Sequence, residues 1–222
     1  MAVLIITTWA VAIFFLMRWE FSFSNPLLYI FILVQTHLYT GLFITAHDAM
    51  HGTVAPKNKP LNNFIGQICT AFYALFPFYR LNEKHQKHHR FVHTENDPDY
   101  HHGNFFTWYF NFVKQYISWW QIVAMAIIFN ILKIWIAEPN LLFFWVFPSL
   151  LSTLQLFYFG TYLPHYGEHD NRHQSKSQSK NHLWAFLSCY FFGYHYEHHD
   201  SPATPWWKLW EQKEKNLEVK NG

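Results

Sequence analysis

Four clusters of closely spaced histidines constrain this chain more than any other feature of its sequence. Two clusters have the spacing His-x-x-His-His, and two are His-x-x-x-His pairs. On a helix, positions three and four apart share one face, with Cβ atoms about 5–6 Å apart, so each cluster can direct two or three imidazoles at one point. The histidines are His47, His51, His85, His88, His89, His165, His169, His195, His198 and His199. A fold that uses them together must bring four distant segments to one place.

The number of clustered histidines indicates more than one metal ion. Neutral imidazole nitrogen binds zinc, copper, iron or nickel. A tetrahedral zinc takes about four ligands, so ten imidazoles suit a pair of ions with about five ligands each. Histidines at a membrane surface could produce one such cluster by chance, but hardly four. The sequence therefore predicts one composite metal centre, and a redox metal pair beside membrane helices suits activation of dioxygen against a lipid-soluble substrate.

Long apolar runs indicate an integral membrane protein. Aromatic residues make up 22% of the 222 residues and charged residues only 14%. A transmembrane helix needs about 20 predominantly apolar residues. The first run lacks the basic flank and cleavage site of a secretory signal, so we expect it to be a membrane helix. The four expected spans are residues 2–17, 27–46, 117–137 and 141–163.

Residues 61–79 are also apolar, but the metal centre argues against a span there. If the clusters at His47 and His85 bind the same metals, an even number of crossings separates them, so we expect an interfacial or re-entrant helix. Residues 183–194 have about half the length of a span and should lie at the surface or under the metal site. The expected fold is all-α, with four transmembrane helices in two hairpins plus interfacial helices, forming a single domain over residues 1–222.

Charge predicts the orientation of this topology. Cytoplasmic loops carry an excess of Lys and Arg, and of the 16 such residues all but Arg18 and Lys133 fall on the histidine side. We therefore expect the metal site and both termini in the cytoplasm. A formal net charge of +2 without a basic stripe argues against nucleic-acid binding. Cys69 and Cys189 lie far apart, and we expect no disulfide.

Taken together, the motifs resemble the membrane fatty acid desaturase/hydroxylase superfamily. They read His-Asp-Ala-Met-His, His-Gln-Lys-His-His, Pro-His-Tyr-Gly-Glu-His and His-Tyr-Glu-His-His. Within the superfamily they are most similar to bacterial and cyanobacterial β-carotene ketolases, through Gly52, the Asp97-Pro-Asp99 stretch and Pro-x-x-Pro-Trp-Trp207. The resemblance extends from about His47 to Trp210. Acyl desaturases have Asn-x-x-x-His at the third motif, so direct and water-mediated ligation by His165 both stay open.

The resemblance implies a non-haem di-iron centre held by all ten clustered histidines, with no separate catalytic residue. Such an enzyme would reduce dioxygen with electrons from a ferredoxin-like donor. Its expected reaction converts the C4 methylene of a β-ionone ring to a ketone, taking β-carotene to echinenone or canthaxanthin. A β-carotene 3-hydroxylase and an acyl-lipid desaturase use the same metal chemistry and remain alternatives. A histidine-rich metal transporter or sensor is the non-enzymatic alternative, but it would place ligands inside the spans, where only His37 lies.

Several residues near the histidine clusters have two possible roles. Ligating imidazoles often donate their second N–H to a carboxylate, so six acidic residues either orient ligands or are solvated: Asp48, Asp97, Asp99, Glu168, Asp170 and Glu197. His37 should be neutral and hydrogen-bonded, or should contact a substrate channel. Five other histidines are expected mainly at the surface, with ligation as the alternative: His93, His101, His102, His173 and His182. Three tryptophans, Trp206, Trp207 and Trp210, are expected in an interfacial belt.

Overall fold

The computed structural model describes residues 1–221, with side chains through Glu218, and this part of the chain contains helices but no strand. The expected all-α fold is thus confirmed. The helices are α1 (Ala2–Leu16), α2 (Leu27–Met50), α3 (Lys59–Ala74), α4 (Phe78–Phe91), α5 (Phe105–Tyr116), α6 (Trp119–Leu132), α7 (Glu138–Leu141), η1 (Leu142–Val146), α8 (Phe147–Phe157), η2 (Tyr158–Tyr162), α9 (Leu163–His165), α10 (His182–Cys189), α11 (His195–Asp200), η3 (Trp206–Lys208) and α12 (Leu209–Asn221).

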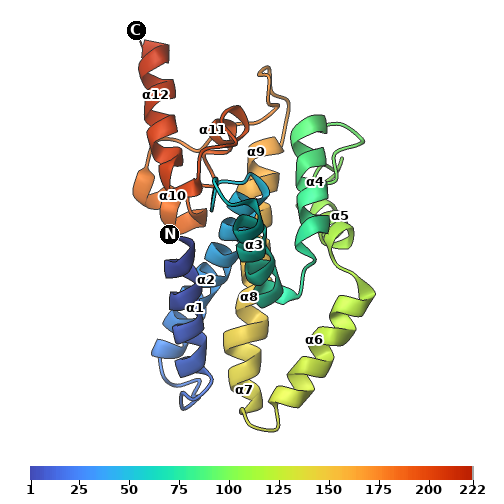
Figure 1. Ribbon diagram of the computed structural model, residues 1–222, viewed down its shortest axis with the longest axis vertical. Coiled ribbons are helices and arrows are strands. Elements are labelled where there is room, and N and C mark those ends of the chain that lie inside the picture. The colour runs from blue at the N-terminus through green and yellow to red at the C-terminus, as the bar shows by residue number, and fades with distance from the viewer. Residues whose placement is uncertain (222) are drawn as a thin grey trace.

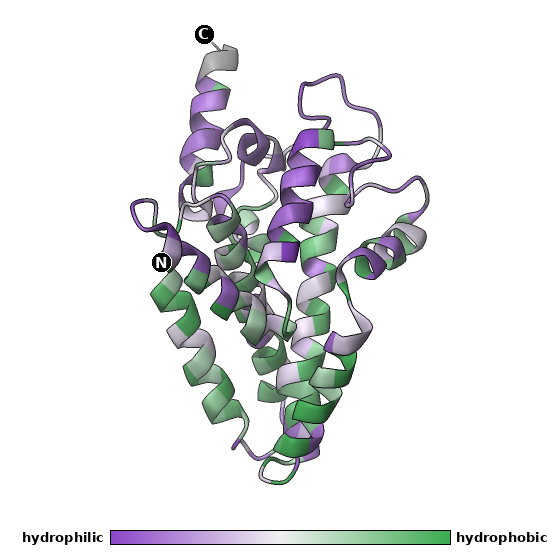
Figure 2. Cartoon of the chain, turned by 45° about the vertical axis from the view of Figure 1, so that its right-hand side comes forward, coloured by the Kyte–Doolittle hydropathy of each residue, from purple (hydrophilic) through white to green (hydrophobic). Residues whose placement is uncertain are grey.

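The molecule has an apolar half and a polar half. The loops that join α1 to α2 and α6 to α7 lie together at one end, and α12 and the histidine-bearing helices lie toward the other (Figure 1). Hydrophobic residues concentrate at the loop end, and hydrophilic residues concentrate around α4, α11 and α12 (Figure 2). Large apolar side chains are exposed throughout the apolar half, among them Phe14, Phe15, Ile30, Leu33, Ile122, Ile127 and Phe147. Apolar surface of this extent indicates a membrane protein.

Two segments of the described chain are long and apolar enough to cross a membrane. They are α2, with 24 residues, and Glu138–His165, a helix of 28 residues that runs from α7 to α9 through the π-helical turns η1 and η2. Helices α5 and α6 could together form a third, although an 82° bend separates them. Helix α1 has 15 residues and α6 has 14, about 21–23 Å at 1.5 Å per residue, whereas the hydrocarbon core is about 30 Å thick. Four full spans are therefore not confirmed.

The expected span at residues 117–137 is present only as the shorter helix α6, which begins at Trp119 and ends at Leu132. Ser118 is the N-cap of α6, and its side chain and that of Gln121 form a capping box. Ser118 also accepts a hydrogen bond from Arg80 Nη1 at 2.5 Å. A capping box satisfies the free N–H groups at a helix start, so the chain turns here, and α5 and α6 become separate helices.

Residues 61–79 leave the histidine-bearing end of the molecule and the chain then returns to it, as the metal-centre argument requires. Helix α3 packs along α2, and the Asn62 side-chain amide donates to the carbonyl of Ala49 at 2.8 Å. Helix α3 ends at Leu75, whose φ is +56°, and α4 returns toward the polar half (Figure 1). Consequently, His85 on α4 lies beside His47 at the end of α2.

Hydroxyl groups link three helices inside the apolar half. Thr40 on α2 lies 2.8 Å from the hydroxyl of Ser152 on α8, and the Tyr73 hydroxyl of α3 donates to Ser152 at 3.1 Å. Interhelical hydrogen bonds of this kind hold helices together where water is absent. They fix α3 against the two long helices.

The C-terminal region closes the polar half. Helix α10 packs against α2 and α8 and does not cross the apolar half, which agrees with the expectation for residues 183–194. Trp206 is 5% exposed and packs on Tyr190 and Phe191. The predicted interfacial belt is therefore wrong for Trp206, because this ring is part of the core between α10 and η3, whereas Trp210 is exposed.

Candidate metal centre

Nine of the ten clustered histidines converge in two sets, each with one ring nitrogen per residue within 4.8 Å of the others. The five-histidine set contains His47, His51, His85, His89 and His198. The four-histidine set contains His88, His165, His195 and His199. Helices α2, α4, α9 and α11 contribute these residues, so all four segments meet at one place.

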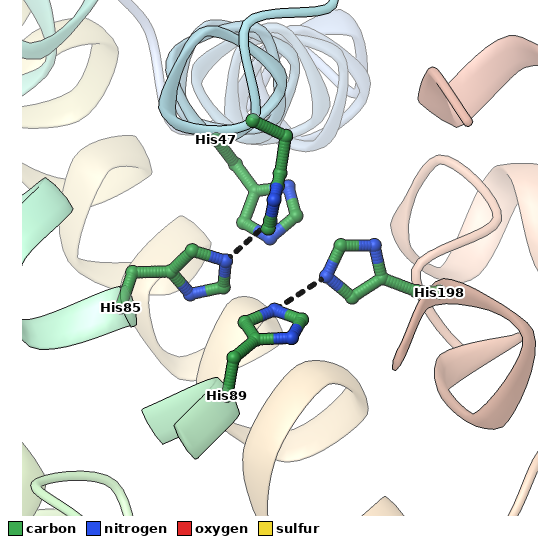
Figure 3. Close-up of side chains that lie close together, drawn as sticks. His47, His85, His89 and His198 are labelled. Carbon is green, nitrogen blue, oxygen red and sulfur yellow. Dashed lines mark hydrogen bonds between the residues drawn. The ribbon is translucent and has the colours of Figure 1, made fainter. Parts of the chain in front are cut away.

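The His-x-x-His-His spacing lets one helix serve both sets. On α4, His85 and His89 are four residues apart and share the face toward the five-histidine set, while His88 points to the other set. On α11, His198 belongs to the first set, and its neighbour His199 belongs to the second. Figure 3 shows the imidazoles from α2, α4 and α11 directed toward a common centre. Two helices therefore hold both sets side by side.

Distances between the imidazole nitrogens fit metal coordination. A metal–nitrogen bond of about 2.1 Å places two ligands at right angles about 3.0 Å apart. The Nε2 atoms of three pairs from different helices lie at such distances: 3.0 Å for His89 and His198, 3.1 Å for His88 and His199, and 2.9 Å for His165 and His195. The nitrogen donors present thus fit two metal ions.

Burial keeps these imidazoles in the form that binds metals. It holds the pKa of His85 well below its usual range, and neighbouring imidazoles add to the effect. The pKa of His89 falls to about 2, and burial is again the largest cause. His198 and His199 are shifted in the same direction for the same reason. Since the neutral ring carries the lone pair that binds a metal, the sites are ready for coordination.

Asp97 orients one ligand through a direct hydrogen bond. His88 Nδ1 lies 2.9 Å and 3.1 Å from the two carboxylate oxygens of Asp97. Burial opposes protonation of His88, but the bond to Asp97 and the charges of Asp97 and Asp99 raise its pKa above the usual value. Asp97 is itself held by the backbone N–H groups of His93 and Asp99. A proton kept on Nδ1 leaves Nε2 for the metal.

We predict that Asp97→Asn weakens metal binding and product formation about 10–100-fold, the usual loss when an outer partner of a ligating histidine is changed. The asparagine amide carries no negative charge, so it holds the proton on His88 Nδ1 less strongly than the Asp97 carboxylate does. The measurement is metal content per protein across a metal titration. Asp48→Asn makes the same substitution next to His47, but Asp48 accepts from the Trp206 backbone N–H at 3.2 Å. An equal loss in both variants would contradict the role of Asp97.

The remaining carboxylates contact other parts of the chain. Asp48 ties the Pro-x-x-Pro-Trp-Trp segment to α2 through Trp206. Glu197, between the ligands of α11, forms a 3.2 Å ion pair with Lys213 of α12 and accepts from the Ser177 hydroxyl. Glu168 is exposed, as is Asp170. No sequence pattern predicted this role of Lys213, because its partner Glu197 is distant along the chain and no local spacing relates the two residues.

His169 is the one clustered histidine that the structure brings into neither set. Helix α9 ends at His165, the next residue is extended, and Gly167 has a φ of +94°. The i,i+4 rule applies only on a helix, so His165 and His169 do not share a face. His169 Nε2 is buried, and no hydrogen-bond partner for it lies within residues 1–218, whose side chains are described. Its role as a ligand remains a prediction.

His165 and several histidines outside the two sets have further contacts. His165 Nδ1 lies 2.9 Å from the Gln174 carbonyl, which can hold its ring as Asp97 holds His88. The ring of His37 stacks on Tyr190 at 4.2 Å. Four more histidines have these partners: the His93 ring lies tilted against Tyr100, His102 contacts the Tyr100 hydroxyl, His173 contacts Asp200, and His182 contacts Tyr194 and Glu214.

Two adjoining cavities lead away from the histidines. The histidine cavity, about 120 Å³, is lined by His47, His85, His88 and His195 together with mainly apolar side chains. The outer cavity, about 450 Å³, lies between α6, η1 and α8. Both are lined by the same five residues, Tyr73, Phe76, Ile117, Leu150 and Thr153. Thr161 lines the histidine cavity, and Leu142 lines the outer cavity. These two residues are 19 positions apart on one helix, so the two cavities together extend about 28 Å along it.

Comparisons with known proteins agree with this geometry. The sequence profile of the fatty acid desaturase family matches residues 24–132 and 104–219. β-Carotene 4-ketolase 3 of Haematococcus lacustris is 40% identical over 202 residues, which cover 84% of this chain and 62% of that protein. Zeaxanthin 4-ketolase of Chlamydomonas reinhardtii is 41% identical, covering 78% of this chain and 41% of that protein.

A bacterial relative is covered more fully. The β-carotene ketolase of Paracoccus sp. (strain PC1) is 38% identical over 192 residues, which cover 84% of this chain and 79% of that protein. This chain thus spans about two fifths to three fifths of the length of the two algal relatives and most of the bacterial one. No solved structure matches the chain.

Proposed function

The chain belongs to the fatty acid desaturase family, and from that premise we propose that it is a di-iron membrane oxygenase that converts the C4 methylene of β-ionone rings to a ketone. One observation carries the proposal: histidines of both sets line the inner of two adjoining, mainly apolar cavities. The relatives described above are carotenoid ketolases. A metal pair at the end of such a cavity suits oxidation of one terminus of a rod-like lipid.

Cavity size supports a substrate that lies across both chambers. Small-molecule sites usually have about 300–1,000 Å³. The histidine cavity is smaller than this, so it suits one end of a molecule, and the outer cavity of about 450 Å³ continues the path. A carotenoid has this form, with a ring at each end of a stiff polyene. One ring would lie under the histidines, and the polyene would extend between α6 and α8.

The residues of this chain would hold, orient and shield the reacting ring. When bound, two iron ions would supply the oxidising chemistry, with dioxygen as co-substrate and electrons from a ferredoxin-like donor. Phe43, Phe192 and Leu156 line the cavity beside the histidines, so they would exclude water and confine the ring. The C4 hydrogens are allylic, and their bonds are weak because the radical delocalises into the polyene.

Two successive oxidations at C4 account for the product. The first replaces a hydrogen by a hydroxyl group and consumes one dioxygen, two electrons and two protons, releasing water. The second repeats this at the same carbon and gives a gem-diol, which loses water to become the ketone. Both steps need the same carbon to stay close to the histidine sets. A cavity that fixes one end of the substrate meets this need.

We further propose four membrane-embedded segments with the metal centre in the cytoplasm. Helices α1, α2 and α6 and the helix Glu138–His165 form the apolar half (Figure 2). Arg18 and Lys133 lie in the loops at the far end of that half (Figure 1), and the other basic residues lie toward the histidines. The positive-inside rule then supports a cytoplasmic location for the histidine sets and both termini.

Expression in a bacterium that accumulates β-carotene tests the function. We expect echinenone or canthaxanthin, identified by absorption and mass. Zeaxanthin would instead identify a 3-hydroxylase, and unchanged pigment with altered acyl chains would identify a desaturase. Metal uptake without any oxidised lipid would favour a transporter, a reading that the clustering of nine imidazoles at one end of the molecule disfavours.

A further inference from the structure

Thr161 lines the histidine cavity, and the described side chains offer its hydroxyl group no hydrogen-bond partner. The residue is 5% exposed and lines that cavity. Threonines in helices usually donate to the carbonyl four residues back, and four others here do so: Thr36, Thr40, Thr45 and Thr153. Thr161 lies in the π-helical turn η2, and its hydroxyl makes no hydrogen bond within residues 1–218, whose side chains are described. Single π-helical turns often mark functional sites.

Asp99 supplies a second polar group to the same cavity. Its side chain lines the cavity and is 9% exposed. One carboxylate oxygen accepts a hydrogen bond from Tyr116. The other, Oδ2, lies 3.8 Å from His88 Nδ1, which is too far for a hydrogen bond. A carboxylate oxygen is thus available to accept a bond from a molecule in the cavity.

Both groups lie at the histidine end of the cavity. Thr161 is four residues before His165 on the same continuous helix, and Asp99 lies beside His88. Most of the remaining lining is apolar, from residues such as Phe43, Leu81, Phe112 and Phe192. A ligand that satisfies both polar groups would carry a hydroxyl close to its reacting carbon.

We propose that Thr161 and Asp99 bind a hydroxyl group at C3 of a β-ring, so that the site oxidises 3-hydroxylated rings in preference to unsubstituted ones; this inference rests on the proposed ketolase function. C3 is bonded to C4, so its hydroxyl must lie at the histidine end whenever C4 does. That hydroxyl can donate to Asp99 and accept from Thr161. Hydrogen bonds to a charged partner are stronger than neutral ones, and an unsubstituted ring leaves both groups unpaired.

Intramolecular competition tests the preference. β-Cryptoxanthin carries one unsubstituted β-ring and one 3-hydroxylated β-ring, so both compete within one molecule for one enzyme. The wild type is expected to place the ketone on the hydroxylated ring about tenfold more often, which corresponds to about one good hydrogen bond. Mass spectrometry of the fragments identifies the oxidised ring. Enzyme amount, metal occupancy and substrate uptake affect both rings equally and cancel in the ratio.

Two variants assign the preference to the side chain. Thr161→Val keeps the shape but removes the hydroxyl, and it should bring the ratio of ring products close to one. Thr161→Ser restores a hydroxyl and should keep the wild-type preference. An even ratio in the wild type, or an unchanged ratio in Thr161→Val, would overturn this inference alone. Failure of the wild type to form a 4-ketone on either ring of β-cryptoxanthin and on β-carotene would overturn the proposed function and the inference with it.

Discussion

Replacing His198 with alanine is expected to abolish ketone formation and to lower the metal content of the protein. His198 is 2% exposed, belongs to the five-histidine set, and its Nε2 lies 3.0 Å from that of His89. Changing an outer partner of a ligand already costs about 10–100-fold, so the loss of a ligand should cost more. Product should fall below detection in β-carotene-accumulating cells. Elemental analysis of purified protein gives the metal content.

His169→Ala is the matched variant, because the sequence motif and the structure make opposite predictions for it. The motif makes His169 a ligand equivalent to His198. The structure places it in neither set, so the variant should retain metal and form ketone. Full loss of metal in His169→Ala would show that the loop after His165 closes over the centre when metal binds. Retained metal and turnover in His198→Ala would remove that residue from the ligand set.

The contrast between these two histidines explains how far spacing alone could predict the site. His-x-x-His-His is informative on α4 and α11, because helix geometry converts the spacing into a shared face. The imidazoles of His165 and His169 do not meet, because the helix ends at His165. In the sequence, only Gly167 marks that end. Glycine is the residue that most readily takes the positive φ found there.

The fold was predictable where the chemistry imposed a constraint and less so where length was the only guide. Because His47 and His85 were expected to meet, residues 61–79 were expected to bring the chain back to the histidines, and His85 does lie beside His47. The span at 117–137 was inferred from hydropathy alone. Its start was predicted to within two residues, but α6 ends at Leu132 and is too short to cross the hydrocarbon core. The contact between Glu197 and Lys213 could not be predicted, because pairing across separate helices leaves no periodic signal.

Obstructing the junction of the two cavities should abolish ketone formation while leaving the metal centre intact. Leu150 lines both cavities and is 55% exposed, so a larger side chain can be accommodated without filling the core. In Leu150→Trp, the indole ring should occupy the path of the polyene and keep the β-ring from the histidines. We expect at least about a hundredfold less product, since small displacements of a reacting group cost about that much. Metal content should equal that of the wild type.

Leu154→Trp provides the matched control for this obstruction. Leu154 lies one turn further along α8, is also exposed, and lines neither cavity. The two variants add the same ring to the same helix, so a general effect of tryptophan on folding or insertion should appear in both. Loss of product in Leu150→Trp alone, with metal retained in each, would locate the substrate path between α6 and α8. Normal ketone formation in Leu150→Trp would mean that the carotenoid reaches the histidines by another route.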